Sequence, residues 1–310
     1  MLGSKSVSFK PESDIPPLNG KVILITGGNI GLGKQCILEY ARHNPAQIWL
    51  AARNLEKAKA AVEEIQKQLP NINPATIKIL ELDLSSLASV QKAANNFIAQ
   101  SDRLDILMLN AGIMAAPPGL TEDGFELQWG TNYLGHALLA RLLLPVLEKT
   151  VRIPGADVRI IALSSHGHQY APKPDGIQFD SLKTTADALG PYGRYSQTKL
   201  ATVLWARHMA KLYPQFTIAS IHPGVVQTNL MNNATGSSCV VRVLGKVANY
   251  VVTPVDQGAR NQLWASVAKD VKSGEYYEPV GIGGNASEFG KNEELAQKLW
   301  DWTVEALETY

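Results

Sequence analysis

At 310 residues, the chain is long enough for one large α/β domain or two small ones. The 29 Lys and Arg against 28 Asp and Glu give a formal net charge of +1, and their scatter argues against a protein that binds nucleic acid or another polyanion. The two cysteines, Cys36 and Cys239, supply neither a disulfide framework nor a CxxC metal site, so a reducing compartment is expected.

Residues 1–19 are expected to form an exposed arm, and they contain no apolar run typical of a secretory signal. The longest apolar stretches lie at about 137–147 and 239–252, and basic residues such as Arg141 and Arg242 interrupt both. Neither reaches the ~20 residues that a membrane span requires. We therefore expect a cytoplasmic protein without an integral membrane segment.

Short apolar runs alternate with amphipathic segments along the rest of the chain. Strands are predicted at Val22–Thr26, Ile48–Ala52, Ile77–Leu82, Ile106–Asn110, Val158–Ser164 and Thr217–Ile221. Helices are predicted at about 32–43, 54–69, 86–100, 121–149, 192–213 and 291–309. This alternation implies right-handed βαβ units. The sequence therefore predicts a single α/β domain over residues 20–310, with a Rossmann-type, doubly wound parallel sheet of about seven strands and helices on both faces.

Two long irregular segments, 166–191 and 229–253, follow strands at the predicted carboxyl edge of this sheet. Open α/β folds bind their ligands at that edge, and long loops in compact domains are usually functional. We therefore expect both segments to be substrate loops.

A glycine-rich turn joins the first strand to the first helix, with the sequence TGGNIGLG at 26–33. Glycines at such a turn let backbone N–H groups approach a pyrophosphate at the helix N-terminus. An ordinary strand-to-helix turn is the alternative, which the position between strand and helix disfavours. The predicted cofactor-binding residues of the turn are Gly27, Asn29, Ile30, Gly31, Leu32 and Gly33.

The second strand ends at Leu50-Ala51-Ala52-Arg53-Asn54, about twenty residues after the turn, where many dinucleotide folds place an acid that binds the ribose 2′-hydroxyl. A guanidinium without a carboxylate suits a 2′-phosphate, so Arg53 favours NADP(H) over NAD(H). Alternatively, Arg53 is a solvated helix-start residue and Glu56 takes the acid's place.

Tyr195 and Lys199 lie one helical turn apart in YSQTK and share a helix face. Lowering the tyrosine pKa by about three units requires roughly 4 kcal/mol. One cation about 4 Å away supplies roughly that much at an effective dielectric near 20. The spacing therefore predicts a phenol, activated by Lys199, that exchanges protons with a substrate oxygen.

Three histidines fall near the predicted site. His166 and His168 lack a third ligand at a usual spacing, so no metal site is predicted and both are expected to belong to the substrate pocket. His222 is expected to be a strand-end residue near the cofactor.

Seven motifs occur in a fixed order: TGGNIGLG at 26–33, LDL at 82–84, NAG at 110–112, Asn132 within TNYLGH, SS at 164–165, YSQTK at 195–199 and PGVVQT at 223–228. In this order the chain resembles the short-chain dehydrogenase/reductase family, in its shorter, non-extended branch. It is most similar there to retinol-dehydrogenase-like and WW-domain-oxidoreductase-like enzymes and their fungal relatives. The resemblance runs from about Gly20 to the C-terminal helix.

For the cofactor, the resemblance implies that Asp83, next to Leu84, binds the adenine edge, although a helix N-cap or turn role for Asp83 is equally open. The NAG motif would line the adenosine ribose and steady the sheet, and the PG motif would flank the nicotinamide, with Thr228 reaching its carboxamide. The implied cofactor residues outside the glycine turn are Asp83, Leu84, Asn110, Ala111, Gly112, Tyr195, Lys199, Pro223, Gly224, Val226 and Thr228.

For catalysis, the resemblance implies that Ser165 hydrogen-bonds the substrate carbonyl, with Ser164 as the alternative. Tyr195 would be the general acid or base, and Lys199 would also hold the nicotinamide ribose hydroxyls. Asn132 would anchor a water that relays protons to Lys199, and asparagine in the middle of a helix is unfavourable without a partner.

Together these features predict an NADP(H)-dependent oxidoreductase that moves a hydride between nicotinamide and a carbonyl or hydroxyl carbon. Aromatic and aliphatic residues in the two loops suggest a lipophilic substrate such as a retinoid, steroid or polyketide; alternatively they are core residues. These residues are Tyr170, Phe179, Tyr192, Val240, Val241, Val243, Leu244, Val247 and Tyr250. The alternative functions are a catalytically silent NADP(H)-binding sensor or scaffold and a non-redox epimerase or dehydratase. A homodimer through helices 121–149 and 192–213 is possible in this family.

Overall fold

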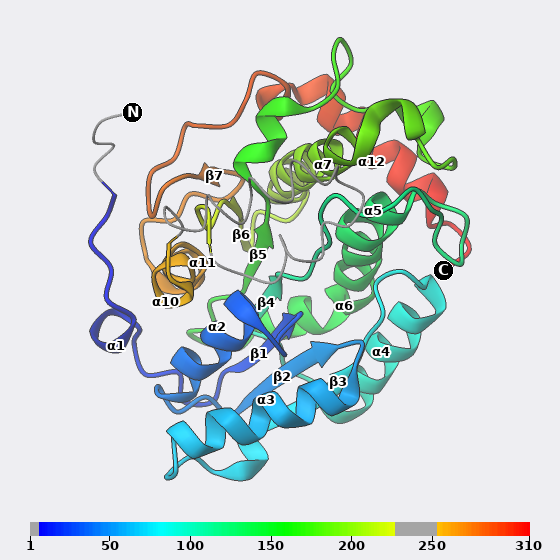
Figure 1. Cartoon of the computed structure of the whole chain (residues 1–310). Helices are drawn as coiled ribbons and strands as arrows, with labels where there is room; N and C mark the ends of the chain where they lie inside the picture. Colours follow the sequence, from blue (N-terminus) through cyan, green and yellow to red (C-terminus); the bar gives the residue numbers. More distant parts are fainter. Residues whose placement is uncertain (1–5, 227–252) are drawn as a thin grey trace.

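The computed structural model describes residues 6–226 and 253–310. Its centre is one sheet of seven parallel strands in the order β3-β2-β1-β4-β5-β6-β7 (Figure 1). The strands are β1 Val22–Thr26, β2 Gln47–Ala52, β3 Ile77–Glu81, β4 Ile106–Leu109, β5 Arg159–Leu163, β6 Thr217–Ile221 and β7 Tyr276–Tyr277. The strand order reverses between β1 and β4, which is where doubly wound sheets bind dinucleotides. The predicted fold class is confirmed.

The strands are mainly apolar because the sheet is covered on both faces. Along β1, Val22 and Leu24 pack into one core cluster, whereas Ile23 and Ile25 pack into the other. Side chains of a strand point alternately to opposite faces, so one short run contributes to both cores.

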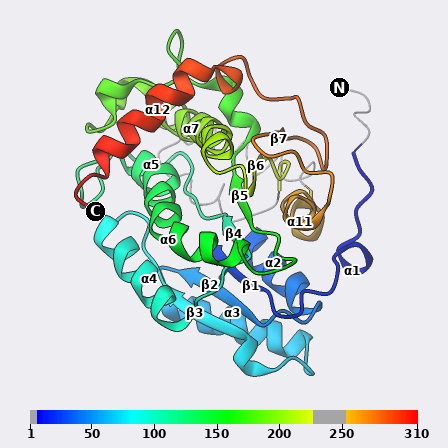
Figure 2. The same cartoon turned by 180° about the vertical axis from the view of Figure 1, so that it is seen from behind.

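Two layers of helices enclose the sheet (Figures 1 and 2). One face is covered by α4 Leu87–Gln100, α6 Gly135–Val151 and α7 Gly190–Leu212. Helix α12, Glu293–Ala306, packs beside α7 in the same layer. The opposite face is covered by α2 Gly31–Ala41, α3 Leu55–Gln68 and α11 Arg260–Val267, with the short helices α1 Pro11–Asp14 and α10 Val255–Gly258 beside them. No helix in the described ranges is long and apolar enough to cross a membrane.

Side-chain caps fix where several helices begin. Asn54 accepts a hydrogen bond from the Lys57 N–H at the start of α3, and Ser86 and Asn292 cap α4 and α12 in the same way. Each cap satisfies a backbone donor that has no partner within the helix.

The predicted helix 121–149 is wrong at its N-terminal end. Residues before α5 (Leu127–Trp129) form a turn closed by a bridge between Leu120 and Glu126. A π-helical turn, Gly130–Leu134, then leads into α6. The Glu126 carboxylate caps α5 by accepting from the Trp129 N–H, which explains why helix begins only there.

The N-terminal arm also differs from the expectation, because Phe9, Ile15 and Leu18 are buried in the core beneath α2 and α11. The predicted substrate loop 166–191 is largely irregular and contains three 3₁₀ turns, at His166–Tyr170, Phe179–Ser181 and Asp187–Leu189. The other predicted loop, 229–253, lies outside the described residues except for Thr253.

Candidate active site

The predicted motifs meet at the carboxyl edge of the sheet. The glycine turn follows β1, the NAG motif follows β4, the serine pair follows β5 and the PG motif follows β6. Helix α7 packs against the turn that follows the serine pair, and the Lys199 ammonium donates a hydrogen bond of 2.7 Å to the Leu163 carbonyl at the end of β5.

The glycine turn has the geometry of an anion cradle. Gly27 and Gly31 adopt left-handed φ angles of +67° and +52°, which glycine reaches without a steric penalty. A Cβ at Gly33 would lie 2.5 Å from the Gly27 carbonyl oxygen, so a side chain is excluded there. No side chain caps the first N–H groups of α2 at Ile30, whose side chain is 44% exposed. Unpaired donors at the positive end of a helix dipole fit a pyrophosphate.

Thr26 ties this turn to the NAG motif. The backbone N–H groups of Asn110 and Ala111 both donate to the Thr26 hydroxyl oxygen at 2.9 Å, and the Asn110 side chain donates to the Thr26 carbonyl at 2.8 Å. The expected role of Asn110 in steadying the sheet therefore has a structural basis, while its contact with a ribose stays a prediction.

His136 extends this network to Asn132 and was not identified from the sequence. Its Nε2 lies 2.8 Å from the Thr26 hydroxyl oxygen, and its Nδ1 lies 2.9 Å from the Asn132 carbonyl oxygen. Because the hydroxyl already accepts two backbone N–H groups, its own hydrogen points to Nε2, and Nδ1–H donates to Asn132. Burial lowers the His136 pKa to about 4, which keeps the ring neutral. The only feature of the sequence that could have linked His136 to the site is that it follows Asn132 by four residues on the predicted helix.

Asn132 lies in the π-helical turn with its side chain fully engaged. Oδ1 accepts from the Ile113 N–H at 2.7 Å, and Nδ2 donates to the Ile113 carbonyl at 2.8 Å and to the Thr198 hydroxyl at 3.2 Å. These contacts supply the partners that a mid-helix asparagine needs, and they join the segment after β4 to α7. Its predicted role in anchoring a water stays a prediction.

The two serines of the pair have different surroundings. The Ser164 hydroxyl is buried and donates to the Lys199 backbone carbonyl at 2.7 Å. The Ser165 hydroxyl accepts from the Gly167 N–H at 3.0 Å. It lies beside Tyr195, since a Cβ at Gly167 would be 3.3 Å from the Ser165 hydroxyl oxygen and 3.2 Å from Tyr195 Cε1. Of the two candidates, Ser165 is therefore the one that the fold places beside Tyr195.

Tyr195 does not have the lowered pKa that the spacing predicts. Burial raises the pKa of the phenol to about 12, although the neighbouring Ser165 hydroxyl opposes that rise. The Lys199 ammonium is directed to the Leu163 carbonyl and lies 5.6 Å from the centroid of the Tyr195 ring. Burial also lowers the Lys199 pKa to about 8, so the ammonium remains mostly charged at neutral pH and loses its charge above about pH 8.

The predicted adenosine side is open to solvent. The Arg53 side chain is 74% exposed, and its Nη1 lies 3.7 Å from Asp83 Oδ2. Asp83 Oδ1 accepts from the Ser85 N–H at 2.9 Å and the Ser85 hydroxyl at 2.6 Å, so Asp83 shapes a turn and is not the N-cap of α4. The Leu84 side chain is buried in the core, and its carbonyl oxygen packs closely against Gly135. Glu56 pairs with Lys59 at 2.9 Å.

At the end of β6, Pro223 and Gly224 follow His222, and Gly224 has a left-handed φ of +89°. Val226 is buried and forms a bridge with Thr253. Asn261 of α11, which the sequence analysis did not identify, donates to the His222 carbonyl at 2.8 Å and so fixes this strand end. Thr228 lies outside the described residues.

A hydrogen-bonded group involving His166 lies beside the serine pair. His166 Nδ1 lies 2.8 Å from Glu278 Oε1, and the Tyr276 hydroxyl donates to Glu278 Oε2 at 2.6 Å. His222 Nε2 lies 4.0 Å from the same Glu278 oxygen, and burial lowers the His222 pKa to about 4.

Nowhere in residues 6–226 or 253–310 do three or more His, Cys, Asp or Glu side chains form a group that could hold a metal ion.

His168 has a structural role and does not face a substrate. It is fully buried, with Nδ1 2.7 Å from the Ser165 carbonyl oxygen and Nε2 accepting from the Ser287 N–H at 3.0 Å. The expectation that His168 is a pocket residue is therefore wrong. Its two contacts hold the backbone of Ser165 in place.

Comparison with known proteins agrees with this arrangement. The family model described as short chain dehydrogenase matches residues 21–173. The chain is 37% identical over 308 residues to the short-chain dehydrogenase/reductase drtF of Aspergillus calidoustus, covering 94% of this chain and 95% of the relative. It is 36% identical over 287 residues to human retinol dehydrogenase 13, covering 91% and 82%.

Among solved structures, an uncharacterised protein from Mycobacterium paratuberculosis superposes with a TM-score of 0.75 at 28% identity, covering 97% of this chain and 98% of the other. The fold, the order of the motifs and the similarity to these relatives all indicate the same family. The chain belongs to the short-chain dehydrogenase/reductase family of oxidoreductases.

Proposed function

We propose that the protein is an NADP(H)-dependent oxidoreductase that interconverts a carbonyl and an alcohol, with Tyr195 as the general acid or base. The observation that supports this most directly is that the Ser165 hydroxyl and the buried Tyr195 ring lie side by side at Gly167, with the buried Lys199 one turn further along α7. The cradle after β1 lies at the same edge of the sheet. When bound, the nicotinamide cofactor supplies or accepts the hydride.

In this proposal Tyr195 and Ser165 both hydrogen-bond the substrate oxygen. During reduction, Tyr195 donates its proton to that oxygen, and Ser165 stabilises the negative charge that develops on it. Lys199, whose ammonium donates to the Leu163 carbonyl, would bind the ribose hydroxyls of the cofactor. Gly112 of the NAG motif lies beside both Lys199 and Asn132, since a Cβ there would be 3.7 Å from the Lys199 ammonium and 3.2 Å from Asn132 Oδ1.

The raised pKa of Tyr195 supports reduction as the easier direction near neutral pH. A phenol with a pKa of about 12 remains protonated, as an acid catalyst must be. Alcohol oxidation requires the same group to accept a proton, and that direction gains from higher pH.

The preference for NADP(H) rests on Arg53. Its guanidinium is exposed, and the strand end before it, Ala51-Ala52, carries no carboxylate. The nearby Asp83 lies 3.7 Å from Arg53 and is available to orient it. We expect Arg53→Ala to weaken NADPH binding about tenfold or more, because a charge-assisted contact with phosphate is worth roughly 1.5–3 kcal/mol. NADH binding should be unchanged; an unchanged preference between the two cofactors would overturn the assignment.

A lipophilic substrate is supported by Tyr170 and Tyr192, which are 71% and 43% exposed in the segment between Ser165 and Tyr195. Phe179 does not contribute, because it packs against Trp302 of α12 with ring centroids 6.4 Å apart. The apolar residues predicted at 240–250 lie outside the described residues.

The proposed activity is tested by a screen. The full chain is mixed with NADPH and, in turn, with butanal, decanal, benzaldehyde and acetophenone, and the loss of NADPH absorbance is followed. We expect turnover of at least one carbonyl, with the longer aldehyde preferred. NADPH binding without oxidation across the panel would instead favour a silent sensor or scaffold, or a non-redox epimerase or dehydratase.

A further inference from the structure

Arg194, the residue before Tyr195 on α7, is only 1% exposed, which is unusual for an arginine. Its guanidinium donates to two backbone carbonyls from different parts of the chain. Nη2 donates to the Ala116 carbonyl at 2.8 Å, and Nη1 donates to the Thr185 carbonyl at 3.0 Å. The contacts span 78 and 9 residues of sequence, so one side chain joins three segments.

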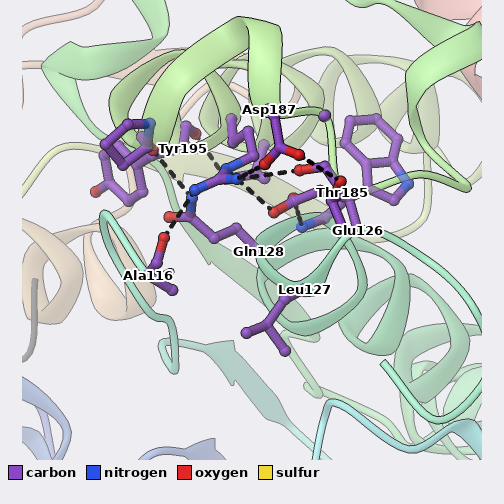
Figure 3. Close-up of polar contacts among 12 residues, drawn as sticks. Ala116, Glu126, Leu127, Gln128, Thr185, Asp187 and Tyr195 are labelled. Atoms are coloured by element: carbon purple, nitrogen blue, oxygen red, sulfur yellow. Dashed lines mark hydrogen bonds and ion pairs between the residues drawn. The ribbon is translucent and has the colours of Figure 1, made fainter. Parts of the chain in front are cut away.

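Two carboxylates complete the surroundings of this guanidinium. Glu126 Oε1 lies 3.6 Å from Nε of Arg194, and Asp187 Oδ1 lies 3.7 Å from its Nη1. Glu126 is fully buried, and its other oxygen accepts from the Trp129 N–H at 2.7 Å. Figure 3 shows Ala116, Glu126, Thr185 and Asp187 directed toward a common centre. Arg194 and Glu126 are both buried, so removing one of the two charges would leave the other uncompensated, which is strongly destabilising.

The backbone is strained beside both carbonyls that Arg194 holds. Ala115 and Ala186 each have a left-handed φ of +48°, and each is the immediate neighbour of a residue bonded to Arg194. A non-glycine residue in this region costs of order 1–3 kcal/mol and persists only where its surroundings hold it. In residues 6–226 and 253–310, Asn44 is the only other non-glycine residue with positive φ. Both strained sites thus coincide with the arginine contacts.

The two segments held in this way adjoin the predicted catalytic residues Asn132, Ser165 and Tyr195. Residues 113–126 connect the end of β4 to α5, and their first residue is bonded to Asn132. Residues 171–189 continue from the turn after Ser165 to the start of α7. Gln128 adds a second tie by donating to the Pro191 carbonyl at 3.0 Å.

We propose that Arg194 is a positioning residue that fixes these two segments beside Tyr195 and so sets which carbonyl substrates fit. This inference rests on the proposed carbonyl reduction. Only arginine suits the position, because its planar guanidinium presents five donors in a fixed fork, whereas lysine offers a compact charge with three. Arg194→Lys keeps the charge but cannot bond both carbonyls and face both carboxylates at once.

The test compares a long with a short aldehyde on the same enzyme preparation. The values of kcat/KM for decanal and butanal are measured with saturating NADPH, and their ratio is formed, since the fraction of folded enzyme cancels in that ratio. A long substrate must contact the flanking segments, whereas a short one need not. For R194K we expect the decanal-to-butanal ratio to fall about tenfold, mainly through a higher KM for decanal, with the Kd for NADPH within about twofold of wild type.

Arg207→Lys is the matched control. Arg207 lies on the same helix, pairs with Glu293 at the surface and touches neither segment, so its ratio should equal that of the wild type. If R194K does not fold, Glu126→Gln carries the same test, because it keeps the shape and the acceptor for the Trp129 N–H but removes the charge facing Arg194; its ratio should fall likewise. An unchanged ratio in the folded variant overturns the role of Arg194 alone. A wild type inactive on every carbonyl of the screen overturns the proposed function and this inference with it.

Discussion

Replacing Gly33 by alanine tests the anion cradle without removing any polar group. The added Cβ would lie 2.5 Å from the Gly27 carbonyl oxygen and 2.7 Å from Asn110 Nδ2. The first contact is with backbone, so the turn itself has to move. Overpacking of this kind costs typically about 1–3 kcal/mol.

If the turn moves, the N–H groups that would hold the pyrophosphate lose their alignment. A loss of about 2 kcal/mol in binding free energy corresponds to a rise of roughly thirtyfold in the Kd for NADPH. The assay is a titration that follows the fluorescence of NADPH, accompanied by a thermal melt to establish that the variant is folded.

Gly119→Ala is the matched control, because a Cβ there would meet only Leu127 Cδ2 at 3.8 Å, an ordinary contact. It should bind NADPH like the wild type. A folded Gly33→Ala variant whose Kd for NADPH stays within about twofold of wild type would refute the assignment of this turn to the cofactor.

The remaining predictions concern the serine pair and pH. Ser165→Ala should lower kcat about a hundredfold, the usual effect of losing one donor at a developing oxyanion, while NADPH binding is kept. Ser164→Ala should instead reduce the unfolding free energy by about 1 kcal/mol, since the Ser164 hydroxyl bonds only the Lys199 carbonyl. A greater loss of kcat in Ser164→Ala than in Ser165→Ala would reverse the assignment of the two serines. With a Tyr195 pKa of about 12, kcat for carbonyl reduction at saturating NADPH should be nearly flat between about pH 6 and 9, whereas the Kd for NADPH should rise as Lys199 loses its proton near pH 8, and alcohol oxidation should rise with pH. Loss of reduction above an apparent pKa near ~7 would show that Lys199 lowers the tyrosine pKa after all.

Much of the fold was predictable because its signals are local. Six of the strands are short, mainly apolar runs, and the glycine-rich turn after β1 is equally recognisable from its composition. Strand β7, Tyr276–Tyr277, has only two residues and therefore no periodicity to detect. Helix α11 is largely buried on all sides, so it lacks an amphipathic pattern.

The sequence predicted which residues form the candidate site, but it did not predict the contacts between them. The spacing of Tyr195 and Lys199 gives their place on one helix, yet the direction of the ammonium depends on the Leu163 carbonyl, which only the fold brings there. Likewise, His136 acts through Thr26, 110 residues away in sequence. Burial then decides the direction of the tyrosine pKa, and burial is a property of tertiary packing.

The most direct test of the account is Tyr195→Phe, which removes the phenolic oxygen and leaves the ring. NADPH-dependent reduction of the best substrate from the screen should fall by about 10²–10⁴-fold, the range expected for loss of a general acid. The Kd for NADPH should remain close to that of the wild type. A Tyr195→Phe enzyme that binds NADPH and still reduces the carbonyl at the wild-type rate would contradict the central claim.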